Sequence, residues 1–173
     1  TDPLTQLSNR SHTDEYLKKH LSHGLPARHA LIVIIADIDH FKAVNDNYGH
    51  LAGDHVLREF SQLLKEHTRT QDFVGRWGGE EFIIAMPDIT PGQAVKNAER
   101  LRSAIEDYDF GSSGPVTASF GVALSTEHDT RESLIGRADE CLYKAKSQGR
   151  NRIITDKVFA QSGHGTQVSC NQA

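Results

Sequence analysis

The feature that most constrains this chain is an unbroken apolar run over residues 30–36, which ends directly in Asp37-Ile38-Asp39. β-Branched residues dominate the run, and a short continuous run of this kind predicts a strand buried on both faces of a sheet. Residues at the C-terminal end of such a strand reach the edge of the sheet, where ligands commonly bind in α/β folds. The run therefore predicts a central strand that delivers carboxylates to a binding site.

The remaining pattern predicts helices and strands in mixed order. Apolar residues at helical spacing predict a helix over 53–67, and two β-rich runs on either side of a Gly-Gly pair predict a hairpin. Thr90, Pro91 and Gln93 form the capping-box pattern of a helix start. Further expected elements are a strand over 116–124, a helix that ends at Gly149 and a short strand over 151–155. This order predicts an α/β (α+β) fold with a mixed central sheet and helices packed on it, rather than a purely parallel doubly wound sheet.

The length of 173 residues is that of one domain, and the last part of the chain is polar and rich in Ser, Gly and Gln. We expect a single folded domain over residues 1–155 and a flexible C-terminal tail over 156–173. No apolar run approaches the roughly 20 residues that cross a bilayer. The chain begins with Thr1 rather than methionine, which suggests a cut point inside a longer protein.

The charge balance excludes one class of function. Nineteen Lys and Arg against 23 Asp and Glu give a formal net charge of -4, which argues against a polybasic nucleic-acid binder. It does not exclude a small anionic ligand, because a site can be locally positive or can recruit metal ions. The two cysteines, Cys141 and Cys170, lie too far apart in sequence for a disulfide framework or a zinc spacing, so we expect a reduced, cytoplasmic domain.

Two acidic clusters are the strongest candidates for chemistry. Asp37 ends the predicted central strand, and Glu80-Glu81 follow the Gly78-Gly79 turn directly. Carboxylates brought together from two elements repel one another unless a cation neutralises them. Mg²⁺ prefers such oxygen ligands and leaves room for phosphate oxygens. A solvated acidic hairpin tip is the alternative interpretation of the second cluster.

Several other polar residues suit a nucleotide, although each also has an ordinary structural explanation. The segment after Asp39 predicts a helix start whose free N–H groups suit an anion, and Lys42 adds a cation there. An amide and a carboxylate, Asn45 and Asp54, suit the edge of a guanine base. Lys42 could be an ordinary surface lysine, and Asn45 and Asp54 could be turn and cap residues. Lys146 and Arg150 could be cations that complement a helix C-terminus. Arg69 and Asp72 could be a chance R-x-x-D string.

The order of these segments resembles that of the GGDEF family of diguanylate cyclases. The motifs that carry the resemblance are DIDHFKAVND at 37–46, GHLAGD at 49–54 and RWGGEEF at 76–82. Glu at the third motif position is a common active variant in that family. The resemblance covers about residues 1–155. Its departures are Gln6, which stands where the family usually has glycine, and Ser11, which replaces a frequent second arginine.

The resemblance implies a fold like the palm of nucleotidyl cyclases and polymerases. It also implies condensation of two GTP molecules into cyclic di-GMP and pyrophosphate, with Mg²⁺ or Mn²⁺, across a homodimer formed at least transiently. Carried over residue by residue, the implied metal ligands are Asp37, the Ile38 carbonyl, Glu80 and Glu81, and the implied catalytic residues are Glu80 as base and Lys42. The implied substrate contacts are His40, Phe41, Lys42, Asn45, Asp54, Gly78, Gly79, Lys146 and Arg150.

The resemblance also implies regulation. Arg69 and Asp72 stand at the family's inhibitory-site spacing, and Arg100 stands where a second product-contacting arginine is found. We therefore expect feedback inhibition by cyclic di-GMP. An N-terminal sensory or regulatory domain is also expected in the full protein, and attachment of that protein to a membrane through its N-terminal part stays open. The alternatives to an active enzyme are an inactive receptor for GTP or cyclic di-GMP and a regulatory interaction domain.

Overall fold

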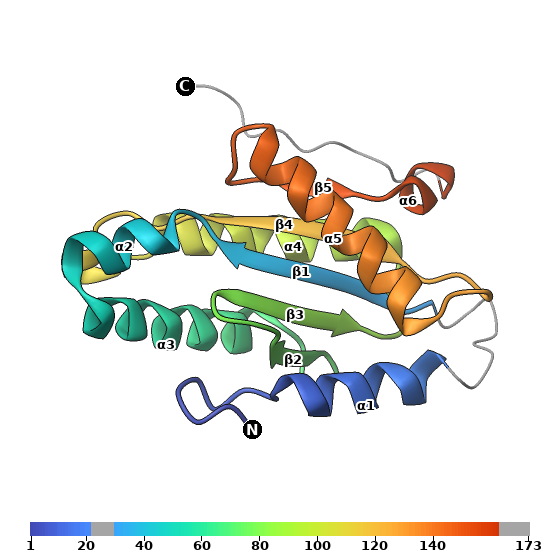
Figure 1. Cartoon of the computed structure of the whole chain (residues 1–173). Helices are drawn as coiled ribbons and strands as arrows, with labels where there is room; N and C mark the ends of the chain where they lie inside the picture. The colour runs from blue at the N-terminus through green and yellow to red at the C-terminus, as the bar shows by residue number, and fades with distance from the viewer. Residues whose placement is uncertain (22–29, 163–173) are drawn as a thin grey trace.

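The computed structural model describes residues 1–21 and 30–162, and its centre is a five-stranded sheet with the order β2-β3-β1-β4-β5 (Figure 1). Strand β1 pairs antiparallel with both β3 and β4, whereas β5 pairs parallel with β4. The strands are β1 (Ile32–Ile38), β2 (Phe73–Arg76), β3 (Glu81–Met86), β4 (Ala118–Leu124) and β5 (Ile153–Thr155). The predicted mixed sheet with packed helices is confirmed.

Strand β1 is the middle strand of the sheet, and every one of its residues is buried. Its alternate side chains enter two different cores, as the period of two in a strand requires. Ile32, Ile34 and Ala36 face one cluster, while Val33 and Ile35 face the other. A run of this kind is stable only between two helical layers, and the unbroken apolar sequence predicted that position.

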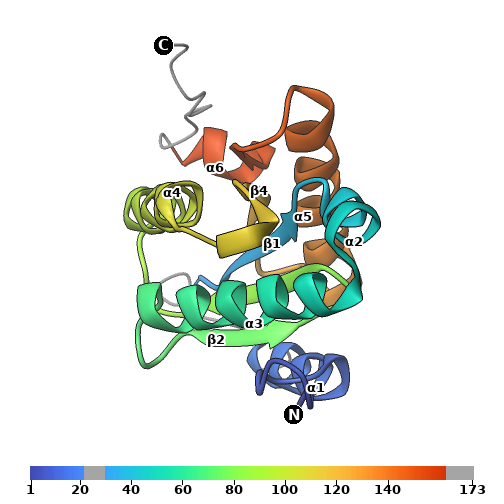
Figure 2. The same cartoon turned by 90° about the vertical axis from the view of Figure 1, so that its left-hand side faces the viewer.

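The helices form these two layers. The helices are α1 (Arg10–Leu21), α2 (Phe41–Tyr48), α3 (His50–His67), α4 (Pro91–Asp107), α5 (Arg131–Ser147) and α6 (Lys157–Gln161), with a 3₁₀ turn η1 (Gly111–Ser113). Residues of α2, α3 and α4 pack into the first cluster, and residues of α1 and α5 into the second. Figure 2 shows α4 and α5 on opposite sides of β1 and β4. Aromatic packing joins α3 to the sheet, with the Phe60 and Phe82 ring centroids 4.9 Å apart.

Several element boundaries differ from the prediction. Helix α3 begins at His50 rather than at residue 53, directly after Gly49 with φ 85. The last strand begins at Ile153 rather than at residue 151, because Arg150 and Asn151 have φ of 65 and 46, which a strand cannot contain. Helix α1 was not predicted at all. The predicted capping box at the start of α4 is confirmed, with Thr90 as the cap.

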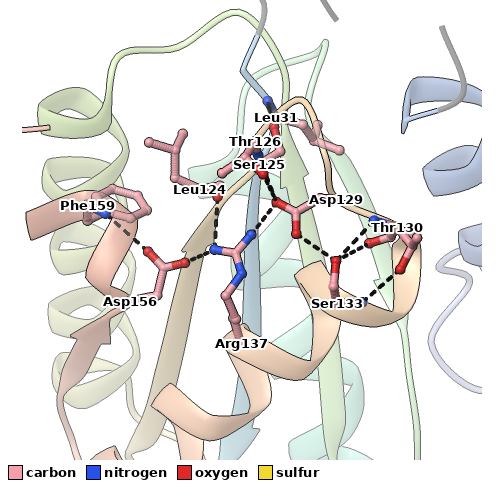
Figure 3. Close-up of polar contacts among 10 residues, drawn as sticks. All are labelled: Leu31, Leu124, Ser125, Thr126, Asp129, Thr130, Ser133, Arg137, Asp156 and Phe159. Carbon is pink, nitrogen blue, oxygen red and sulfur yellow. Dashed lines mark hydrogen bonds and ion pairs between the residues drawn. The ribbon is translucent and has the colours of Figure 1, made fainter. Parts of the chain in front are cut away.

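The segment after residue 155 is not loose where the structure describes it, which corrects the expected start of the flexible tail. Asp156 is buried and pairs with Arg137 of α5, which also binds Asp129 (Figure 3). Asp156 Oδ1 accepts a hydrogen bond of 3.2 Å from Phe159 N, and the Phe159 side chain is fully buried in the first cluster. Only Val158 and Phe159 in a largely polar segment signal this packing, so composition alone missed it. Residues 163–173 lie outside the described residues, and for them a flexible tail stays a prediction.

Within the two described stretches of chain, none of the helices is both long and apolar enough to span a membrane.

Phe159→Ala tests whether this short segment belongs to the folded unit. We expect the free energy of unfolding to fall by about 3–5 kcal/mol, because the substitution leaves a cavity under the sheet edge. Chemical denaturation measures the loss, and Lys157→Ala on the exposed side of the same helix serves as the control. Equal stability of the two variants would show that the segment contributes nothing to the domain.

Candidate functional site

The carboxylates predicted to meet do meet at the C-terminal end of β1. Asp37 lies opposite Glu81 in the β1–β3 register, and Ile38 N donates to Glu80 O at 3.3 Å. Figure 1 shows this end of β1, the β2–β3 turn and α2 at the same end of the molecule. The antiparallel pairing of two central strands therefore gathers three acidic side chains and the Ile38 backbone in one place.

The charges of these carboxylates are poorly compensated. Burial raises the pKa of Asp37 above its ordinary value, although Lys146 opposes the rise. Burial also raises the pKa of both Glu80 and Glu81, and the negative charge of Asp37 raises each further. Lys146 Nζ lies 2.9 Å from Asp37 Oδ2 and is the cation that faces this cluster most directly. The site favours additional positive charge.

The donor atoms suit a Mg²⁺ or Mn²⁺ ion. They are all oxygens, and burial raises the pKa of Asp37 and Glu80, so a cation would stabilise their ionised forms. Among the described residues, no group of three or more His, Cys, Asp or Glu side chains is arranged to hold a metal ion. Mg²⁺ commonly uses one or two carboxylates and completes its shell with water and substrate phosphates. Asp37, Glu80 and the Ile38 carbonyl fit that pattern better than a closed protein cage.

Hydrogen bonds from the backbone and from Arg76 fix the shape of the hairpin turn. Trp77 N and Gly78 N donate to Glu81 O at 2.8 and 3.2 Å. The Arg76 guanidinium donates to Gly79 O at 2.6 Å and to Gly78 O at 3.2 Å. A Cβ on Gly79 would meet no atom within 4 Å, so packing within the chain does not require glycine there. The bare backbone instead leaves space for a ligand.

Arg76 also ties the N-terminal segment to the turn, a role that sequence reasoning missed. Arg76 Nη1 lies 3.2 Å from Asp2 Oδ1, and Arg76 N donates to Ser8 O at 2.8 Å. Gln6, between these contacts, has φ 57. Glycine adopts that conformation without strain, which explains why the resembled family usually has glycine there. The arginine directly before Gly-Gly was the available signal in the sequence.

The start of α2 offers the expected anion site. His40 precedes the helix with φ 55, and no side chain among the described residues caps it. Ala43 N donates to His40 O at 2.9 Å, so the first-turn donors left available to an anion are the N–H groups of Phe41 and Lys42. Lys42 in this turn is exposed and can reach a bound anion.

The two candidate base-binding residues are brought together by Gly53. Asn45 lies on α2 and Asp54 on α3, and Gly49 N donates to Asn45 O at 2.8 Å between the helices. A Cβ on Gly53 would lie 2.0 Å from Asn45 Oδ1. The missing side chain of Gly53 thus lets the Asn45 amide lie against α3 next to Asp54, a packing role that the sequence analysis did not assign.

Lys146 and Arg150 reach the carboxylate cluster from the end of α5. Besides the Lys146 contact, the positive charge of Arg150 opposes the rise in the pKa of Asp37 that burial causes. A role as cations that complement a helix end therefore does not account for the contact of Lys146 with Asp37.

Arg69, Asp72 and Arg100 lie elsewhere. The Arg69 guanidinium binds Asp72 Oδ1 at 2.6 Å and Pro87 O at 2.8 Å, and Arg100 Nη2 donates to His67 O at 3.0 Å. These contacts surround the C-terminal end of α3, whereas Asp54 belongs to its beginning (Figure 1). The 18 residues of α3 span about 27 Å at 1.5 Å per residue, so the two groups of residues are separate.

Comparisons with known proteins show which family and fold the chain shares. The family model described as "Diguanylate cyclase, GGDEF domain" matches residues 1–152. Diguanylate cyclase DosC of Escherichia coli is 38% identical over 156 residues, which cover 88% of this chain and 34% of DosC. The chain thus spans about a third of the length of that relative.

Solved structures of similar domains include the following two. The GGDEF domain of DgcB from Caulobacter crescentus, in complex with c-di-GMP, has a TM-score of 0.84 and 30% identity, covering 90% of this chain and 94% of that one. The active GGEEF domain of a diguanylate cyclase from Vibrio cholerae has a TM-score of 0.81 and 33% identity, covering 87% and 98%.

Asp37→Asn tests whether the acidic cluster is short of positive charge. Because the folded pKa of Asp37 lies above its ordinary value of 3.8, protonation favours the folded chain and the free energy of unfolding falls as pH rises through that range. At pH 7 without divalent ions the neutral amide should therefore raise the melting temperature, by about 2–4 °C.

Mg²⁺ should raise the melting temperature of the unsubstituted chain and leave that of Asp37→Asn nearly unchanged. Thermal unfolding with and without Mg²⁺ measures both effects, with the exposed Glu127→Gln as the matched loss of one negative charge. An equal Mg²⁺ response in all three chains would contradict the assignment of Asp37 as a ligand.

Proposed function

Because the chain belongs to the GGDEF family of diguanylate cyclases, we propose that it condenses two GTP molecules into cyclic di-GMP with release of two pyrophosphates. The observation that carries the proposal is the meeting of Asp37 and Glu80 beside Lys146, next to the open Gly-Gly turn and the uncapped start of α2. The cluster favours a cation, and its surroundings favour phosphate. A nucleoside triphosphate with its divalent ion satisfies both preferences.

In the proposed reaction, the 3′-hydroxyl oxygen of one GTP attacks the α-phosphorus of the other, and the bond to pyrophosphate breaks. Glu80 accepts the hydroxyl proton, a role that its raised pKa makes more favourable. Lys42 and the N–H groups of His40 and Phe41 hold the phosphates and stabilise the charge that develops on them. Asp37, the Ile38 carbonyl and Glu80, with Glu81 nearby, would hold a Mg²⁺ or Mn²⁺ ion, which would neutralise charge on the pyrophosphate.

The other residues hold the substrate in place. Asn45 and Asp54 contact the guanine edge, while Gly78 and Gly79 let the hairpin backbone approach the nucleotide. Lys146 and Arg150 bind the distal phosphates. Positioning of this kind supplies most of the rate in phosphoryl and nucleotidyl transfer.

The symmetry of the product implies a homodimer. One domain has one set of base and phosphate contacts, so it holds one GTP, and closing a symmetric ring requires two such sites to face each other. We infer a two-fold dimer that forms at least transiently. The N-terminal sensory or regulatory domain stays a prediction, supported by relatives that are about three times as long as the matched segment.

Product inhibition is proposed at the distant end of α3. Arg69 is oriented by Asp72, whose side chain is fully buried, and the exposed Arg100 donates to His67 O. A pair of oriented guanidinium groups can grip the phosphates or the Hoogsteen edge of cyclic di-GMP. Bound product would then hold the two domains away from the productive arrangement.

Glu80→Gln tests the enzyme against the alternative of a nucleotide receptor. We expect kcat to fall at least about 100-fold, because the general base is lost while the size of the side chain is kept. Incubation with GTP and Mg²⁺, followed by measurement of pyrophosphate and cyclic di-GMP, gives the rate, and Glu127→Gln should keep full activity. Tight GTP binding without turnover by the unsubstituted chain would favour the receptor instead.

Arg100→Ala and Arg69→Ala test product feedback. Titration of cyclic di-GMP during turnover should give at least about tenfold weaker inhibition in either variant, since each loses a charged contact. Arg58→Ala, an exposed arginine on α3, is the matched control. Arg100→Ala is the milder change, because Arg69 also supports Asp72 and Pro87. Inhibition of equal strength in all variants would exclude this site.

A further inference from the structure

Asp39 is an acidic residue next to the carboxylate cluster that does not share its chemistry. Its carboxylate is buried and accepts hydrogen bonds from Ser119 Oγ at 2.6 Å, Thr117 Oγ1 at 2.7 Å and Asn151 N at 3.0 Å. These donors leave it little capacity for a metal ion or a substrate. Asp39 instead joins the end of β1 to β4 and to the turn that follows α5.

That turn has an unusual backbone. Gly149, Arg150 and Asn151 have successive φ values of 119, 65 and 46. Glycine tolerates this region, but for arginine and asparagine it costs free energy, which surrounding contacts must offset. The turn therefore needs anchors outside itself to keep its shape.

Asn151 supplies those anchors. Its backbone N–H binds Asp39, its Oδ1 accepts from Arg102 Nη1 at 2.7 Å, and its Nδ2 donates to Glu106 Oε1 at 2.8 Å. Arg102 is itself buried on α4 and paired with Glu99 and Glu106. The turn is thus held between the end of β1 and helix α4.

The position of this turn decides where two cations lie. Lys146 stands in the last turn of α5 with its Nζ 2.9 Å from Asp37, and Arg150 N donates to Ala145 O at 2.9 Å. Arg150 is the residue directly before Asn151. Since Asp37 and Asp39 leave the same strand end, the bond from Asn151 to Asp39 sets the turn in place relative to the proposed metal ligand.

We propose that Asp39 is a positioning residue that, through Asn151 N, holds Arg150 in its left-handed conformation and keeps Arg150 and Lys146 aligned with the phosphates beside Asp37. The proposal deepens the proposed function and rests on it. It also explains why Asp37 and Asp39 have different surroundings. Asp37 faces Lys146 and the proposed metal site, whereas Asp39 accepts hydrogen bonds from three donors.

A double-substitution cycle on GTP turnover tests the proposal. Asp39→Ala alone should lower kcat/KM about 10- to 100-fold, because small misplacements of phosphate contacts have effects of that size. In an Arg150→Ala background, Asp39→Ala should lower kcat/KM by less than about threefold further, since Asp39 acts through the turn that carries Arg150. Fully multiplicative losses would show a merely structural role and overturn the proposal.

Conservative variants sharpen the cycle. Asp39→Asn keeps an oxygen that can accept from Asn151 N, and should recover most of the activity lost in Asp39→Ala. Thr117→Val removes another donor to the same carboxylate but spares the bond to the turn, and should stay within about twofold of the unsubstituted chain. Equal losses in Thr117→Val and Asp39→Ala would also contradict the proposal.

Amide hydrogen exchange provides a test without activity. Exchange over residues 149–152 should speed up at least about tenfold in Asp39→Ala, while β1 and β4 keep their protection. Should Asp39→Ala fail to fold, the same result is expected when it is combined with Thr117→Val and Ser119→Ala, which remove the two hydroxyl donors left unpaired. Unchanged exchange in the turn would overturn the proposal. A changed turn in a chain that makes no cyclic di-GMP would instead uphold the role of Asp39 while refuting the proposed function.

Discussion

The structure depends on negative charge placed at the end of a strand that has no water on either face. Asp37 directly follows the apolar run over residues 30–36, and antiparallel pairing with β3 brings Glu80 and Glu81 beside it. Burial and mutual repulsion penalise the ionised forms, as the raised pKa values of all three show. A bound cation would offset this repulsion, and the elements around the cluster supply groups that suit a cation and its anionic ligand.

The neighbouring elements meet this constraint in two ways. Cations approach from α5, where Lys146 contacts Asp37 directly. Fixed donors and open backbone lie on the other side, where Arg76 holds the hairpin turn and α2 begins without a side-chain cap. Both kinds of group suit phosphate, which is why the family assignment and the local electrostatics agree. The arginines at the far end of α3 belong to a separate surface.

Much of this arrangement was predictable from local patterns. The apolar run identified β1, the Gly-Gly pair identified the hairpin, and Thr90 with Gln93 identified the capping box of α4, because each depends on residues a few positions apart. The acidic cluster was predictable for a related reason, since the ends of two central strands must meet. Helix α1, the packing of Phe159 and the short last strand were missed or misplaced, because their stability comes from partners distant in sequence.

The sequence by itself determined the family, the mixed α/β class and the residues that gather around Asp37, because these follow from periodicity and from motifs of fixed spacing. Only the tertiary structure decided what each polar side chain does. Asp37 and Asp39 look equivalent in sequence, but one faces Lys146 and the other is saturated by donors from β4 and the turn after α5. Arg76 and Gly53 likewise acquired roles only through contacts with distant segments. The physical reason is that the free energy of a buried polar group is set by the partners that surround it, and the fold alone brings those partners together.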